Sequence, residues 1–191
     1  MNCFEFKDSL SFLNSSLDTL VKNLKEKGHE FALLNQCGLV PPDKPELKNL
    51  MTKKLYYPYQ YLDNVSVLND KHLPTIESFA SDLTGENITE AQYKEAHKMY
   101  EDMKCDTFGD YTSKYCLLDV ILLCEVVFAF REKMLTLTEL DPLNYISLPS
   151  FSFDVFLKKT GTTIECLSDL SMVLFVEQQV YHSLSFKMSI Q

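Results

Sequence analysis

The feature that most constrains the fold is a long apolar run between Tyr115 and Phe130. Within this run, Asp119 and Glu125 are the only charged side chains. A run that is apolar on nearly every side predicts a helix buried inside a globular core. A membrane span needs roughly 20 mostly apolar residues, and this run is shorter and carries two acids, so we expect no contact with a membrane.

Asp119 is the chemical focus of the run, because an ionised carboxylate among apolar side chains is costly unless a metal, a base or hydrogen-bond donors pair with it. Tyr115 precedes Asp119 by four residues and therefore lies on the same helical face. A carboxylate can hold a divalent ion while a phenol positions water for attack on a phosphodiester. The alternative is that Asp119 only accepts structural hydrogen bonds. The same spacing recurs in Tyr59 and Asp63, within an aromatic loop.

Glu125 lies about 120° around the predicted helix from Asp119, given about 100° per residue. The two acids therefore do not form a carboxylate pair on one face. We expect Glu125 to form a salt bridge at the rim of the core.

The charge of the chain argues against a basic nucleic-acid-binding surface. The formal net charge is −9 and the sequence pI is about 4.9. Arg131 is the only arginine among the 18 basic residues, and arginine is the side chain best suited to bidentate phosphate contacts. An independent nucleic-acid adaptor is therefore disfavoured.

The six cysteines are scattered, and neither they nor the four histidines show the spacing of a zinc site. We expect reduced thiols in an intracellular protein, since the first residues lack the basic and apolar blocks of a signal peptide. The compartment stays open, with an organellar, viral or mobile-element origin among the alternatives.

Hydrophobic periodicity predicts a mainly α-helical chain with a few short strands. Helices are expected over residues 16–27, 89–103, 111–134 and 153–159 and from residue 168, with caps at Ser15, Thr89, residues 106–110 and Ser168 and stops at Gly28 and Gly161. Residues 75–83 favour a short helix or turn. Strands are expected within residues 3–13 and 162–166. Prolines interrupt the pattern between residues 31 and 70.

Several segments follow one another in a characteristic order: Phe6–Leu13, Ser16–Leu20, Tyr57–Asp63, Leu73-Pro74, Phe79, Leu83-Thr84-Gly85, Asp110-Tyr111, Tyr115-x-x-x-Asp119, Phe128-x-x-Arg131, Leu140-Asp141-Pro142 and Asp154 to Gly161. In this order they resemble the organellar and viral, protein-primed type of family B DNA polymerases. The resemblance runs from about residue 4 to about residue 177, so it is more specific than any single motif.

The resemblance implies an α/β, ribonuclease-H-like 3′–5′ exonuclease fold, present here in incomplete form. Such exonucleases work with two metal ions, Mg²⁺ or Mn²⁺, held by carboxylates from three motifs. The third motif is Tyr-x-x-x-Asp, so Tyr115 would orient the attacking water and Asp119 would be a metal ligand. Residues 1–139 would be the later half of the exonuclease domain, and residues 140–191 would begin the connection toward the polymerase domain.

The first two exonuclease motifs would lie before Met1 and the palm motifs beyond Gln191, so we expect a partial polypeptide. Tyr181-His182-Ser183 stands where such polymerases carry a glycine pair, and residues 184–191 look unrelated. The partners implied are DNA, deoxynucleotides and a terminal priming protein. For the isolated chain we expect neither polymerase nor nuclease activity, and whether it binds a metal stays open. The alternative is a non-catalytic helical interaction module.

Overall fold

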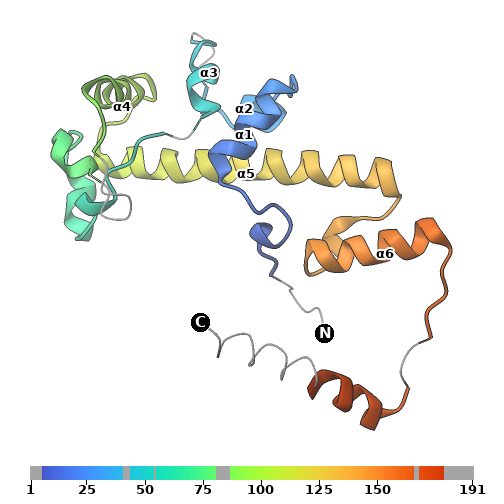
Figure 1. Cartoon of the computed structure of the whole chain (residues 1–191). Helices are drawn as coiled ribbons and strands as arrows, with labels where there is room; N and C mark the ends of the chain where they lie inside the picture. Colours follow the sequence, from blue (N-terminus) through green and yellow to red (C-terminus); the bar gives the residue numbers. More distant parts are fainter. Residues whose placement is uncertain (1–5, 41–43, 54, 81–86, 166–167, 179–191) are drawn as a thin grey trace, which may run out of the picture. The chain divides into compact units, whose positions relative to one another are not determined.

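The computed structural model describes residues 6–40, 44–53, 55–80, 87–165 and 168–178 (Figure 1). Contacts divide the chain into two compact units, Met1–Leu148 and Pro149–Gln191. In the first unit, shorter helices and loops gather around one long helix, α5. This helix carries both residues of the sequence-predicted site, so its packing determines what the site can do.

Helix α5 extends from Phe108 to Thr138, further at both ends than predicted. It begins in a reciprocal capping box: the Thr107 side chain accepts from the Asp110 amide, and the Asp110 carboxylate accepts from the Thr107 amide. It ends at Glu139, whose backbone is left-handed with φ 56°. The turn and cap predicted at residues 106–110 are therefore confirmed.

Only one side of α5 is covered, so the predicted burial on nearly every side is wrong. The covered side includes Tyr111, Leu118 and Leu122. On the other side the side chains of Val120 and Phe128 are 58% and 51% exposed. The physical reason is that most covering segments are short and lie along one stripe of the helix. Residues 7–13 reach only part of the other side, so most of its apolar residues stay in contact with water.

The cover of α5 is built mainly from the segment that precedes it. Its elements are α1 (Leu17–Glu26), α2 (Ala32–Gln36), α3 (Leu47–Met51), η2 (Tyr59–Tyr61), η3 (Val65–Asn69), η4 (Ile76–Phe79) and α4 (Glu90–Asp102). Helices α1 and α2 and the 3₁₀ helix η3 pack directly on α5. The predicted cap at Thr89 is confirmed, whereas the cap of α1 is Ser16, one residue after the predicted Ser15. Each side-chain oxygen accepts an amide three residues later.

The mainly α-helical prediction is confirmed, whereas the part of the chain that the structure describes contains no strand. Residues 9–11 form the 3₁₀ helix η1 (Ser9–Ser11), and residues 162–165 are irregular. Residues 3–5 and 166, which belonged to the two predicted strands, lie outside the described residues. An extended segment becomes a strand only when a neighbour pairs with its amides and carbonyls, and residues 6–13 and 162–165 have no such neighbour among the described residues.

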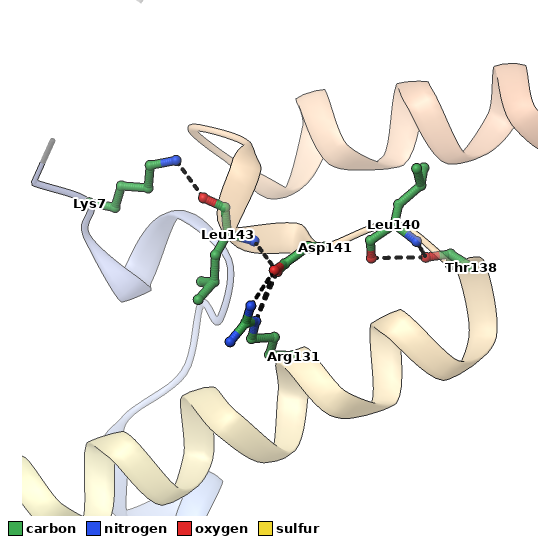
Figure 2. Close-up of polar contacts among 6 residues, drawn as sticks. All are labelled: Lys7, Arg131, Thr138, Leu140, Asp141 and Leu143. Atoms are coloured by element: carbon green, nitrogen blue, oxygen red, sulfur yellow. Dashed lines mark hydrogen bonds and ion pairs between the residues drawn. The ribbon is translucent and has the colours of Figure 1, made fainter.

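The C-terminal end of α5 is fixed by an ion pair to the turn that follows (Figure 2). Arg131 Nε donates to the two carboxylate oxygens of Asp141, at 3.1 and 3.0 Å, and its Nη2 donates at 2.5 Å. Asp141 also caps η5 (Pro142–Asn144) by accepting the Leu143 amide at 3.0 Å. The same carboxylate therefore holds the helix and the turn together.

In the second unit, α6 (Leu148–Thr160) ends before Gly161, whose φ is 64°. The helix predicted over residues 153–159 and its stop are confirmed, although α6 begins earlier. Residues 170–178 are helical, as predicted, but the cap is Asp169 rather than Ser168: its carboxylate accepts the Ser171 amide at 2.9 Å. The expectations for residues 181–191 lie outside the described residues. Among the helices that the structure describes, none is both long and apolar enough to cross a membrane.

Candidate functional site

Tyr115 and Asp119 lie one turn apart in the first half of α5, and the structure brings their polar groups together. Burial raises the pKa of the Tyr115 phenol, and its hydrogen bonds to Tyr59 and Asp119, with the Asp119 charge, raise that pKa further. Tyr115 is 5% exposed. Asp119 is only half-buried, so the expectation of a deeply buried acid is wrong at this position.

Tyr115 belongs to a layer of aromatic rings between α5 and the loop that begins at Leu55. The ring of Tyr57 stacks on Tyr115 with a centroid distance of 4.6 Å. It also stacks on Tyr111 at 6.2 Å and on Phe108 at 5.8 Å. Those three residues recur at intervals of three and four, so one face of the helix presents all of them to one ring. The Tyr57 hydroxyl bonds to the hydroxyl of Thr112 at 3.0 Å.

Tyr59 connects this layer to the surface. Its hydroxyl lies 2.6 Å from the Tyr115 hydroxyl, and its side chain is 61% exposed. The phenols of Tyr59 and Tyr115 and the carboxylate of Asp119 therefore form a polar chain that begins at solvent. Sequence reasoning noted Tyr59 only as part of a repeated spacing with Asp63. Asp63 lies instead at a separate polar cavity of about 430 Å³, with Tyr61 and Glu77.

The protonation of Tyr115 follows from its surroundings. The raised pKa keeps its hydroxyl proton in place throughout the neutral range. The neutral phenol can then donate a hydrogen bond to a carboxylate or a water. Tyr115 is therefore suited to orienting another group and unsuited to acting as a phenolate nucleophile.

Glu125, rather than Asp119, is the deeply buried acid of α5. It is 4% exposed, so the predicted position at the rim is wrong. One carboxylate oxygen accepts the amides of Leu33 and Leu34 at 2.6 and 3.4 Å. The other lies 2.8 Å from His29 Nε2. The carboxylate thus caps α2, whose own preceding residue, Phe31, is left-handed and supplies no side-chain cap.

The donors near Asp119 do not by themselves form a metal centre. Within the described residues there is no group of three or more histidine, cysteine, aspartate or glutamate side chains able to hold an ion. Magnesium takes about six oxygen ligands, of which proteins usually supply one or two carboxylates beside substrate and water. The Asp119 carboxylate could supply one ligand of such a set, and the described residues around it do not complete the set.

Comparison with known proteins supplies the context that the geometry lacks. The family described as "DNA polymerase type B, organellar and viral" matches residues 2–183 of this chain. The chain belongs to this family.

A curated relative of this type B polymerase chain is the "Probable DNA polymerase" of Neurospora intermedia. The two are 28% identical over an alignment of 152 residues, which covers 77% of this chain and 15% of the relative. The chain thus spans a small part of the relative's length. No solved structure matches the chain. The family match includes the aromatic loop, Tyr115, Asp119 and helix α6.

Proposed function

We propose that this chain is the part of a DNA-directed DNA polymerase that contributes one carboxylate, Asp119, to a 3′–5′ exonuclease site. The observation that carries the proposal is the contact between the phenol of Tyr115 and Asp119 on one face of α5, within a type B polymerase chain. In this proposal Asp119 is a metal ligand and Tyr115 orients the attacking water.

The environment of each residue suits its proposed role. Asp119 is half-buried, so an ion can reach its carboxylate. Tyr115 is buried and held on two sides, by the ring of Tyr57 and the hydroxyl of Tyr59, which fixes the direction of its own hydroxyl. The divalent ion, Mg²⁺ or Mn²⁺ in this proposal, would polarise the phosphate and activate the water.

The whole enzyme in this proposal has an α/β, ribonuclease-H-like exonuclease fold. Residues 1–139 supply the later half of that domain, and residues 140–191 begin the connection toward the polymerase domain. DNA and deoxynucleotides are its substrates and a terminal priming protein is its partner. In this proposal the other carboxylates of the two-metal site come from other exonuclease motifs, so we expect neither nuclease nor polymerase activity of the isolated chain.

A chimeric polymerase tests the proposal directly. The matching segment of the Neurospora intermedia relative is replaced by this chain, and degradation of labelled single-stranded DNA with Mg²⁺ or Mn²⁺ is compared between variants. Asp119→Ala should abolish degradation. Tyr115→Phe should slow it by roughly 10- to 100-fold, as for groups that orient metal-bound partners. Polymerase activity of the same chimera is the control and should persist. Full nuclease activity of the Asp119→Ala chimera would exclude the proposed role.

The isolated chain is tested separately with the same DNA and metal ions. We expect no degradation. Degradation that Asp119→Ala abolishes would show that the chain is a nuclease on its own and would overturn the expectation of inactivity.

The second candidate is a non-catalytic interaction module, which the exposed apolar side of α5 favours. Such a module should be monomeric and should unfold cooperatively without metal or partner. This candidate would be favoured if neither Asp119→Ala nor Tyr115→Phe changed the nuclease activity of the chimera and if the isolated chain were monomeric and unfolded cooperatively.

A further inference from the structure

A cavity of about 250 Å³ lies between residues 7–13 and the second half of α5. Its apolar lining comes from the N-terminal segment and from successive turns of the helix: Phe12, Leu123, Cys124, Val127, Phe128 and Phe130. The rings of Phe12 and Phe130 meet across the two segments with centroids 6.4 Å apart and tilted by 54°. The cavity is distinct from the Tyr115–Asp119 site, since no residue of that site lines it.

The charged side chains of this cavity, Lys7 and Asp8, lie at its exposed edge and bond to the backbone. Lys7 Nζ donates to the carbonyl of Leu143 at 2.6 Å (Figure 2). The carboxylate of Asp8 accepts the amide of Leu10 at 2.9 Å. Both side chains are exposed at the edge of the cavity, so a charged ligand within the apolar lining would lose its hydration without a partner there, which is costly. The cavity therefore favours an uncharged occupant.

The volume and the lining of the cavity limit further which uncharged molecules could bind in it. An apolar cavity of about 150 Å³ remains dry and is large enough to bind benzene. The present cavity is larger, and three of its lining side chains are phenylalanines, whose rings favour edge-to-face and offset contacts with another ring. We propose that this cavity is a binding site for a small uncharged aromatic molecule of one or two rings. The inference is independent of the proposed nuclease function.

Cysteine reactivity in the full chain tests this proposal without any substitution. Cys124 lines the cavity, and Cys116 lies exposed two turns earlier on the same helix. Indole is the probe, and modification of each cysteine by a thiol reagent is followed by mass spectrometry. Indole should slow modification of Cys124 by the factor 1 + [indole]/Kd, about tenfold near ten times its Kd, and leave Cys116 unchanged. No slowing, or equal slowing of both cysteines, would overturn the proposal.

Two further probes distinguish other occupants. Hexanol represents an aliphatic chain, and N-acetylphenylalaninamide represents an aromatic side chain of a protein partner. Stronger protection of Cys124 by either probe than by indole would overturn the assignment to a free aromatic molecule.

A matched pair of variants locates the binding. Val127→Phe places a ring inside the cavity and should abolish the protection by indole. Val120→Phe adds the same ring on the exposed side of α5, outside the cavity, and should leave the protection intact. Protection that survives a folded Val127→Phe variant would contradict the site. If that variant does not fold, the comparison of Cys124 with Cys116 in the natural chain still decides the matter.

Discussion

The hydroxyl of Tyr115 lies between the exposed phenol of Tyr59 and the carboxylate of Asp119, beneath the ring of Tyr57. On α5, Tyr111, Tyr115 and Asp119 follow one another at intervals of four residues and therefore lie on one face of the helix. The pKa of Tyr115 is raised there, and burial raises the pKa of neighbouring Tyr111 as well. Both phenols are therefore more easily ionised in the unfolded chain than in the folded one.

This difference predicts a loss of stability at alkaline pH. A raised folded-state pKa contributes stability that is complete below the unfolded tyrosine pKa of about 10 and is lost as the pH rises above it. Urea unfolding at increasing pH should show the free energy of unfolding falling above about pH 10. Tyr115→Phe should make the fall shallower, and Tyr145→Phe, outside the aromatic layer, should not. Equal slopes in all three proteins would contradict the assignment.

Among substitutions that remove one charge, we expect Glu125→Ala to lower the free energy of unfolding most. Glu125→Ala leaves two α2 amides and His29 without their acceptor, and should lower the free energy of unfolding by roughly 2–3 kcal/mol. Glu132→Ala, an exposed acid on the same helix, is the matched control and should change it by less than about 0.5 kcal/mol. Urea unfolding measures both. A similar small effect of the two substitutions would show that Glu125 does not hold α2.

At the scale of the element, the ends of the helices could be predicted from the sequence because their caps are local. The capping box joins Thr89 to Gln92, three residues later, so the sequence pattern contains the whole interaction. The cap of α1, at Ser16, lies one residue from the predicted Ser15. The partners of Glu125 could not be predicted in this way, because His29 and Leu33 are more than ninety residues away in the chain.

The candidate site likewise combines local features, which the sequence predicts, with long-range contacts, which it does not. The spacing of Tyr115 and Asp119 on one helical face is local and could be predicted. The contact with Tyr59 arises only when the aromatic loop folds over α5, across 56 residues of sequence separation. The one-sided cover of α5 also depends on this long-range packing, so composition alone suggested a helix buried all round.

The packing of the aromatic loop on α5 rests chiefly on Tyr57. Tyr57→Ala removes a buried ring that stacks on three others and should cost about 3–5 kcal/mol of unfolding free energy. Tyr57→Phe keeps the ring and loses only the bond to Thr112, so it should cost about 1 kcal/mol. Tyr59→Ala, at a mostly exposed ring, should cost less than Tyr57→Ala. Thermal or urea unfolding that ranks Tyr59 above Tyr57 would refute this account of the loop.

The end of α5 predicts a response to acid. The hydrogen bonds that the Asp141 carboxylate accepts from Arg131 hold the pKa of Asp141 below its usual range, and the hydrogen bond from the Leu143 amide lowers this pKa further. A lowered folded-state pKa contributes stability that is present above the unfolded aspartate pKa of about 3.9 and is lost as the pH falls through the folded value. Stability should therefore fall below about pH 4 in the natural chain, and Asp141→Asn should lose this part of the fall. Asp63→Asn, an exposed aspartate, should retain it. Identical acid transitions in the natural chain and Asp141→Asn would contradict the prediction.

At the scale of the whole molecule, the chain combines a packed core with apolar side chains that meet water. The core of the first unit is continuous from Val21 to Val126, which favours a cooperatively folded unit. The outer side of α5 nevertheless presents Leu117 and Val120 to solvent. An exposed apolar surface of this kind is typical of a contact with another polypeptide, which fits a chain that covers only 15% of its polymerase relative.

This surface should bind a hydrophobic dye while the chain is still folded. Leu117→Lys with Val120→Lys should remove most of the native dye fluorescence, because both side chains lie on the open side of α5. The free energy of unfolding should change little, since neither substitution enters the core. A control pair, Ser113→Lys with Thr136→Lys, adds the same charge to exposed polar positions of α5 and should leave dye binding intact. Dye binding that begins only when urea unfolds the natural chain would show instead that this surface is covered in solution.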